Sequence, residues 1–143
     1  MVTPVPQDPR SFQRAHRIHF SECDPAGIVF YPQYFILFND LLEGWVDAIT
    51  PLGFADMVLK KRFGLPTVHL EAEFFAISRM GDDVTLSLQV ERLGTKSLTL
   101  RLDCVAADGE KRMTVKQTIV TTSLETHQAI EIPPLLKQVL DPA

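Results

Sequence analysis

An aspartate, Asp24, lies in a short segment that also contains Pro25 and Gly27, two residues that favour a turn. A segment with the apolar spacing of a helix begins soon afterwards, at Pro32. The first N–H groups of a helix have no partner within it, so they can hold an oxyanion that develops on a carbonyl. A carboxylate beside them can act as a nucleophile or a general base. The alternative is a structural role, in which Asp24 shapes the turn or caps nearby N–H groups.

Other catalytic patterns are missing from the sequence. It has no Gly-x-Ser-x-Gly motif and no glycine-rich nucleotide-binding motif. The histidines are His16, His19, His69 and His127. Only His16 and His19 are close in sequence, and an isolated strand histidine is usually structural or exposed to solvent. The two cysteines, Cys23 and Cys104, fit neither a disulfide framework nor a metal motif. We therefore expect no bound metal and no cofactor.

The 143-residue chain is long enough for one domain with a sizeable core. Its net charge of −4 excludes the basic excess typical of proteins that bind nucleic acid without sequence selection. No run approaches the roughly 18 apolar residues needed to span a membrane, and the proline-rich N-terminus lacks a signal-peptide pattern. We expect a cytoplasmic protein without nucleic-acid or membrane partners. Residues 1–14 are predicted to be a flexible arm, and residues 15–143 a single domain.

The elements that position Asp24 follow from the spacing of apolar residues. A short strand is predicted over residues 17–21, before the Asp24 segment. A helix is predicted from Pro32, where the missing N–H costs nothing, to about Thr50. The apolar residues at helical spacing within it are Phe38, Leu41, Leu42, Trp45 and Ile49. This is the most apolar helix of the chain, so we expect it to be heavily buried. A shorter helix is predicted over residues 55–62.

The second half of the chain has the pattern of a sheet. Four segments alternate apolar and polar residues: 68–76, 84–90, 98–104 and 112–122. Gly81-Asp82, Gly94-Thr95 and Asp108-Gly109 separate them, which favours antiparallel hairpins. A terminal helix is predicted over residues 133–140. A sheet wrapped around one long central helix would bury both apolar faces, an α+β arrangement of the kind called a hotdog fold.

A specific motif occupies residues 24–34: Asp-Pro-Ala-Gly-Ile-Val-Phe-Tyr-Pro-Gln-Tyr. It resembles the signature of the 4-hydroxybenzoyl-CoA thioesterases of the hotdog superfamily, in which Asp-Pro-Ala-Gly-Ile-Val, an aromatic residue and Tyr-Pro-Asn-Tyr lead into the central helix. Three later segments resemble the family in the same order: 64–68, 81–86 and 96–98. The resemblance covers roughly residues 16–122, and its first motif is the most specific.

The resemblance implies an acyl-CoA thioesterase that hydrolyses an aromatic, 4-hydroxybenzoyl-like thioester to the free acid and CoA. Asp24 matches the catalytic carboxylate, and the backbone N–H of Tyr31 matches the group that polarises the thioester carbonyl. The positions expected to contact the substrate are Gly27, Pro32, Lys96 and Ser97. The family also implies a homodimer or homotetramer whose active sites lie between subunits and bind the CoA phosphates with basic side chains.

The chain departs from the family pattern at two places. Gly94 and Thr95 stand where the type enzyme has two arginines before its Lys-Ser pair, so the residues that hold the CoA phosphates beyond Lys96 are left open. Basic residues that either take this role or lie on a solvated strand edge are Arg92, Arg101, Lys111 and Arg112. Asn39 stands where the type enzyme has an aspartate, with the acid next to it as Asp40. This second departure bears on the preferred acyl group.

Three alternative interpretations concern the chemistry. Another group of hotdog thioesterases uses a helix glutamate, for which Glu43 is the candidate. Hotdog hydratases and dehydratases need a histidine near the acid. In one such pattern the histidine lies five residues after the aspartate, where this chain has Val29. His19 lies five residues before Asp24, but no family pattern supports that position. A non-catalytic acyl-CoA-binding protein is the third alternative, because a fold alone does not determine function.

Overall fold

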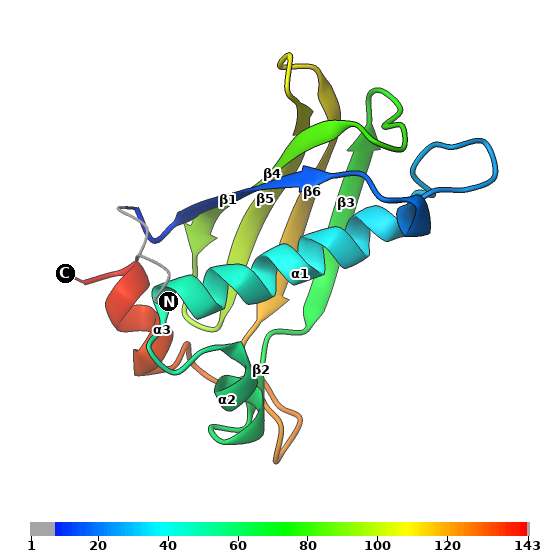
Figure 1. Ribbon diagram of the computed structural model, residues 1–143. Coiled ribbons are helices and arrows are strands. Elements are labelled where there is room, and N and C mark those ends of the chain that lie inside the picture. Colours follow the sequence, from blue (N-terminus) through cyan, green and yellow to red (C-terminus); the bar gives the residue numbers. More distant parts are fainter. Residues whose placement is uncertain (1–7, 143) are drawn as a thin grey trace.

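One long helix lies along a face of an antiparallel sheet in the computed structural model, which describes residues 8–142 (Figure 1). This helix, α1, spans Pro32–Ile49, in agreement with the segment predicted from apolar spacing. Pro32 is its first residue, and the backbone leaves helical geometry at Thr50. The Thr50 hydroxyl donates a hydrogen bond of 2.8 Å to the carbonyl of Val46, which closes the last turn. The predicted α+β class is confirmed.

Five strands form the sheet in the order β1-β4-β5-β6-β3, and every neighbouring pair is antiparallel. Their bounds are Ser11–Arg17 for β1, Thr67–Phe74 for β3, Asp83–Leu93 for β4, Ser97–Ala106 for β5 and Lys111–Val120 for β6. Leu88 lies opposite Leu102, which in turn lies opposite Val115, and all three are buried. Because the central strands have one buried face, their alternating pattern predicted them correctly.

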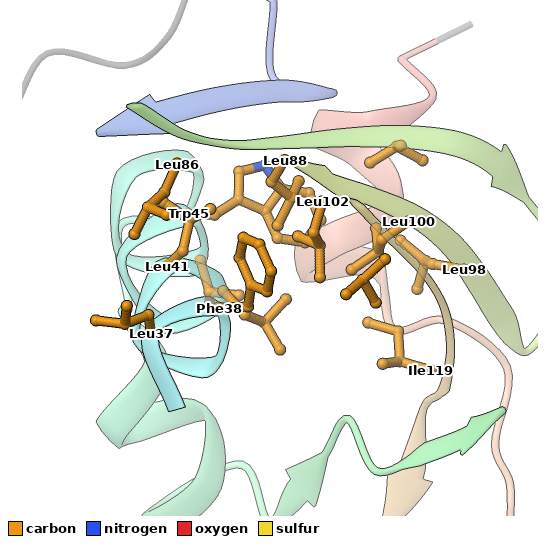
Figure 2. Packing of buried hydrophobic residues seen from close by; sticks show 14 of the residues in the cluster. Leu37, Phe38, Leu41, Trp45, Leu86, Leu88, Leu98, Leu100, Leu102 and Ile119 are labelled. Carbon is orange, nitrogen blue, oxygen red and sulfur yellow. The ribbon is translucent and has the colours of Figure 1, made fainter. Parts of the chain in front are cut away.

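The core lies between α1 and this face of the sheet (Figure 2). Trp45, the only tryptophan, is completely buried, and its indole N–H donates to the carbonyl of Pro9 over 2.7 Å. Figure 2 shows Phe38 and Leu41 of α1 facing leucines of the sheet such as Leu102. Since α1 is buried along most of its length, its first turn has a fixed position relative to the strands. Among residues 8–142, no helix combines the length and apolar character needed to cross a bilayer.

Smaller elements complete the described chain. A 3-10 turn, η1, spans Phe20–Glu22, and α2 spans Phe54–Leu59, shorter than the predicted 55–62. Two short strands, β2 (Phe63–Gly64) and β7 (Thr122–Ser123), pair with each other, and the sequence pattern did not predict them. The helix α3 spans Pro134–Leu140, as predicted for the end of the chain.

The predicted first strand, residues 17–21, is wrong. The strand is β1, which ends at Arg17, and η1 follows it. Residues 11–14, predicted to belong to a flexible arm, are therefore part of the sheet, whereas residues 1–7 lie outside the described part of the chain. β1 pairs with β4 from Ser11 opposite Gln89 to Arg17 opposite Asp83. β1 forms through backbone hydrogen bonds to β4, which most side chains permit. Its side chains are mostly polar and show no alternating apolar pattern, so the sequence did not predict the strand.

The prediction of successive hairpins is correct for two turns and wrong for the third. The segments at 94–95 and 108–109 do join β4 to β5 and β5 to β6. The segment at 81–82, however, joins strands that do not pair, because β3 lies at the far edge of the sheet beside β6. β3 leaves much of its predicted apolar face exposed: Val68 is 62%, Leu70 41% and Phe74 51% exposed, whereas Ala72 packs against the core.

Candidate active site

The Asp24 loop, residues 23–29, is a tight turn at the N-terminal end of α1 (Figure 1). The N–H of Asp24 donates to the carbonyl of Ile28, and the N–H of Gly27 donates to the carbonyl of Asp24, both over 2.9 Å. Gly27 has a φ of 77°, a conformation that other residues adopt only with strain. Cys23 and Val29 bridge the two sides of the loop. The chain is thereby reversed directly before the helix begins.

The Asp24 carboxylate has both a structural contact and a free oxygen. Its Oδ1 accepts a hydrogen bond of 2.8 Å from the N–H of Ala26, so the turn-shaping role considered from the sequence is real. Within residues 8–142, the other oxygen, Oδ2, makes no hydrogen bond to the protein. The side chain is half-buried. One oxygen therefore fixes the orientation of the carboxylate, and the second is available to a substrate.

Tyr31 and Pro32 form the start of α1. Tyr31 already has helical φ and ψ values of −51° and −36°. The N–H groups of Gln33 and Tyr34 donate to the carbonyls of Phe30 and Tyr31 over 2.8 and 3.2 Å. The N–H of Tyr31 makes no backbone hydrogen bond within the described residues. It lies at the positive end of an 18-residue helix, where an unpaired N–H stabilises developing negative charge.

The segment 77–82 holds the Asp24 loop from outside. The N–H of Val29 donates to the carbonyl of Ser78, and the N–H of Met80 donates to the carbonyl of Gly27, both over 2.9 Å. Tyr34, in the first turn of α1, donates its buried hydroxyl to Ser78 Oγ over 2.8 Å, and burial raises the pKa of this tyrosine. Ser78 therefore contacts both the loop and the helix start and fixes one relative to the other.

A partly buried ion pair stabilises the segment 77–82. Arg112 Nη1 donates to Asp82 Oδ2 over 2.8 Å and to the carbonyl of Ile77 over 2.9 Å. Asp82 Oδ2 also accepts from the N–H of Arg79 over 2.9 Å. These donors, first the guanidinium and then the backbone N–H, lower the pKa of Asp82. Arg112, considered from the sequence as a CoA-binding residue, is therefore engaged in supporting the loop.

The predicted site residues fall into two groups in the structure. Asp24, Gly27, Tyr31 and Pro32 lie together at one end of α1. Lys96 and Ser97 lie in the β4–β5 hairpin, where the carbonyl of Thr95 accepts from the N–H of Ile132 close to α3. β5 carries the chain from Ser97 towards the Asp24 end over 10 residues, or roughly 30 Å. One chain thus does not bring Lys96 and Ser97 to Asp24.

The remaining basic candidates lie on the sheet. Arg92 and Lys111 are exposed at strand ends, and Arg101 pairs with Asp103 over 3.1 Å. Glu43, the helix glutamate considered as an alternative, is exposed in α1. Val29, which stands where one hydratase pattern needs a histidine, is buried at 8% exposure.

A cavity of about 360 Å³ lies against α1, between the helix and the β3 edge of the sheet. Its walls are largely apolar, with Phe35 and Ile36 from the helix and Leu70 from β3. Asn39 and Gln117 add amide groups. Asn39, at one of the two departures from the type enzyme that were found in the sequence, therefore lines a cavity. Asp40, the neighbouring acid, instead lines a second cavity beside β1.

That second cavity contains a cluster that the sequence patterns did not reveal: His16, His19 and Glu22. Glu22 is buried, and burial alone would raise its pKa. The hydrogen bonds from the His19 N–H and from His16 together outweigh burial, so the pKa of Glu22 is lowered. These are the only three histidine, cysteine or acidic side chains of residues 8–142 whose ligand atoms gather closely enough for one metal ion.

The chain is similar in sequence to a protein family and to known enzymes. The family model described as the thioesterase-like superfamily matches residues 18–140. The 1,4-dihydroxy-2-naphthoyl-CoA hydrolase of Synechocystis sp. is 21% identical over 108 residues, which cover 76% of this chain and 78% of that protein. The 4-hydroxybenzoyl-CoA thioesterase of Pseudomonas sp. is 29% identical over 101 residues, covering 64% of this chain and 66% of the relative.

A solved structure agrees in fold. The crystal structure of a 1,4-dihydroxy-2-naphthoyl-CoA thioesterase from Synechocystis superposes with a TM-score of 0.82 at 18% identity, covering 91% of this chain and 95% of that one. The hotdog arrangement predicted from the helix and the strands is confirmed by this neighbour. The chain therefore belongs to the thioesterase-like superfamily of hotdog-fold proteins and is a thioester hydrolase.

Proposed function

We propose that this protein hydrolyses an aromatic acyl-CoA thioester to the free acid and CoA, with Asp24 as the attacking or activating carboxylate. The observation that carries the proposal is the half-buried Asp24 carboxylate, which is held by Oδ1 and open at Oδ2, beside the start of α1. The naphthoyl-CoA and hydroxybenzoyl-CoA hydrolases among the relatives support an aromatic acyl group. A 4-hydroxybenzoyl-like group is the narrower form of the proposal.

In this mechanism the Tyr31 N–H donates to the thioester oxygen. The charge that develops on that oxygen in the tetrahedral state is stabilised by the helix N-terminus, without a metal or a cofactor. Asp24 then acts in one of two ways. As a nucleophile it forms a mixed anhydride and releases the CoA thiolate, and water later hydrolyses the anhydride. As a general base it takes a proton from the water that attacks the carbonyl. Both routes consume one water and yield acid and CoA.

We place the acyl group in the 360 Å³ cavity beside α1. Phe35 and Asn39 follow Tyr31 by four and eight residues, so they lie on the same side of the helix as the proposed oxyanion donor. The apolar walls suit an aromatic ring, and the amides of Asn39 and Gln117 are suited to bind a ring hydroxyl. Lys96 and Ser97 are proposed to contact the CoA moiety.

The position of Lys96 requires a second copy of the chain in this proposal. Lys96 and Ser97 lie at the end of the sheet far from their own Asp24, so in an assembled site they would come from a partner subunit. The edge strand β3 supports a homodimer or homotetramer, because its second edge has no strand beside it within residues 8–142. Exposed apolar residues lie on β3 and in the segment that follows it: Val68, Leu70, Phe74, Phe75, Ile77 and Met80.

A thiol-release assay over a panel of aromatic and aliphatic acyl-CoA thioesters tests the proposal. We expect aromatic substrates to be hydrolysed faster, and Asp24→Asn to lower kcat about 10²–10⁴-fold on the best of them. Asparagine keeps the oxygen that accepts from the Ala26 N–H, so the turn should persist. Full activity of Asp24→Asn would refute the mechanism, and turnover of none of the panel would favour the binding-protein alternative.

Asp108 offers a matched control. It also accepts a backbone N–H two residues later, that of Glu110, over 2.9 Å before a glycine with positive φ. Asp108→Asn makes the same chemical change at an aspartate with the same side-chain contact, in the loop that joins β5 to β6. It should leave kcat unchanged, so a loss confined to Asp24→Asn reports on chemistry rather than on turn stability.

A further inference from the structure

Two histidines and a buried glutamate meet where β1 ends and η1 begins. His16 Nε2 lies 2.9 Å from Glu22 Oε1 and 3.1 Å from Oε2. His19 Nδ1 lies 3.6 Å from Glu22 Oε2. All three residues offer one ligand atom within 4.8 Å of the others. We propose that His16, His19 and Glu22 form a binding site for one Zn²⁺ ion.

The distances from both histidines to Glu22 fit tetrahedral coordination. Zinc binds imidazole nitrogen and carboxylate oxygen at about 2.0–2.1 Å, so neighbouring ligand atoms of a tetrahedral site lie roughly 3.3 Å apart. Glu22 Oε2 lies 3.1 Å from His16 Nε2 and 3.6 Å from His19 Nδ1, one separation on either side of this value. An ion bound to this oxygen and to both rings therefore replaces the proton that His16 and Glu22 share. The two ring nitrogens, which lie within 4.8 Å of each other, move closer together around the ion. The mixed nitrogen and oxygen ligands favour Zn²⁺ over Mg²⁺, which prefers oxygen.

The backbone holds the ligands in place. The N–H of His19 donates to Glu22 Oε1 over 2.8 Å, which fixes the carboxylate at the start of η1. The side chains of His16 and Glu22 are 17% and 11% exposed, whereas that of His19 is 62% exposed. Two ligands are therefore fixed by packing, and the third lies on the solvent side, where an ion enters. The fourth position is left to water.

The surrounding charges favour a cation. The cluster lines a cavity of about 210 Å³ that also contains Asp40 and Arg14. The Arg14 guanidinium lies against Gly44 and over the ring of Phe12 at 5.7 Å, rather than pairing with Glu22. The carboxylates of Glu22 and Asp40 face the single guanidinium of Arg14 in this cavity. The net charge near the ligands is thus negative.

A bound ion would join the end of β1 to the turn that precedes the Asp24 loop. The carbonyl of Glu22 accepts the N–H of Phe30 over 3.0 Å, just before α1. Zn²⁺ binding to the folded chain should therefore raise its unfolding temperature. The site is separate from Asp24 in its ligands, so binding is measured without substrate and does not depend on turnover.

The test is a calorimetric titration of the metal-free full-length protein with Zn²⁺, with native mass spectrometry to count the ions. We expect one Zn²⁺ per chain, no comparable binding of Mg²⁺, and at least a tenfold loss of affinity in His16→Gln and in His19→Gln. Because the His19 side chain is mostly exposed, its replacement should not prevent folding. The Zn²⁺-dependent rise in unfolding temperature should disappear in the same two variants.

Two controls separate this site from adventitious binding. His69 also contacts a glutamate, Glu71, over 2.8 Å but belongs to no three-ligand cluster of residues 8–142; His69→Gln should bind as the wild type does. Cys23→Ser should also bind normally, since the Cys23 thiol points to the His19 carbonyl over 3.4 Å. The proposal is overturned if the wild type shows no saturable binding, if either ligand variant loses less than tenfold, or if a control variant loses binding.

Discussion

We expect Tyr34→Phe to lower the free energy of unfolding by about 1–2 kcal/mol. The tyrosine hydroxyl donates to Ser78 Oγ over 2.8 Å, and the two residues are 4% and 1% exposed. Removing the hydroxyl takes a partner from Ser78 where water does not reach, so the cost is that of an unsatisfied buried group rather than of an average hydrogen bond. For a domain of this size the change corresponds to a fall in Tm of roughly 3–8 °C.

A double-mutant cycle isolates this hydrogen bond. Ser78→Ala alone leaves the Tyr34 hydroxyl buried without its acceptor, at a similar cost. The double variant removes both polar groups, so its loss should be smaller than the sum of the single losses by about 1 kcal/mol. The Ser78 carbonyl, which accepts from Val29, is unchanged in all variants. Urea unfolding followed by the fluorescence of the buried Trp45, at one fixed protein concentration, gives all four free energies.

The same variant tests the coupling of α1 to the Asp24 loop. If Ser78 sets the distance between the Tyr31 N–H and Asp24, Tyr34→Phe should lower kcat by about tenfold with little change in KM, because small displacements of catalytic groups are costly. Strictly additive single losses, or a Tyr34→Phe protein with the stability and kcat of the wild type, would refute the reasoning that this contact holds the two parts together.

Two further substitutions test the support of the loop. Asp82→Asn, which breaks the charged contact with Arg112, should cost about 1 kcal/mol at neutral pH, since the pair is only partly buried. Because the guanidinium lowers the pKa of Asp82 below its ordinary 3.8, its contribution is present above about pH 4 and disappears on further acidification. The wild type should therefore lose more stability between pH 5 and pH 3 (about one unit either side of pH 4) than Asp82→Asn, and equal losses in urea titrations would contradict this assignment. Gly27→Ala and Gly109→Ala impose similar strain, of about 1–2 kcal/mol, at open positions with φ of 77° and 92°, but only Gly27→Ala should also lower kcat; an equal effect on the activity of both would argue against a specific role of the Asp24 loop.

The part of the site that could be predicted from sequence is its local part. Asp24, Gly27 and Pro32 lie within nine residues, and the turn chemistry of that segment and the apolar spacing after it placed the carboxylate before a helix. The structure confirms that placement. The central strands were predictable for the same reason, because their alternating pattern is a property of consecutive residues.

The support of the loop was not predictable in this way. Ser78 contacts Tyr34 across 44 residues, and Arg112 reaches Asp82 across 30. No local pattern connects such positions, and Arg112 appeared from the sequence to be one of several basic candidates. Tyr34 was the one indication of this support in the sequence. A hydroxyl on an apolar helix needs a hydrogen-bond partner once it is buried, so a polar contact of Tyr34 could have been expected, but not which residue makes it.

The His16, His19 and Glu22 cluster was missed because the end of the first strand was misplaced. The predicted strand over residues 17–21 ends before Glu22, and in extended backbone two side chains three positions apart, such as those of His16 and His19, point to opposite faces, so no cluster was expected. β1 instead ends at Arg17, and η1 reverses the chain over Phe20–Glu22. The spacing of His16, His19 and Glu22 in the sequence matches no metal motif. The hydrogen bond from the His19 N–H to the Glu22 carboxylate holds that carboxylate beside the two histidines.

The motifs around Asp24 and Lys96 differ in whether a single chain brings their residues to the proposed site. The motif around Asp24 predicts a turn directly before a helix, and the structure of one chain shows this turn. The motif at Lys96 lies at the other end of β5, roughly 30 Å along the sheet. Lys96 can contact the same substrate as Asp24 only if it comes from another subunit. If Lys96 binds CoA, its replacement by alanine should raise KM without altering kcat, and the effect should vanish under conditions that dissociate the proposed oligomer. A KM effect that persists in the monomer would mean that Lys96 acts without a partner subunit, contrary to the arrangement proposed for this protein.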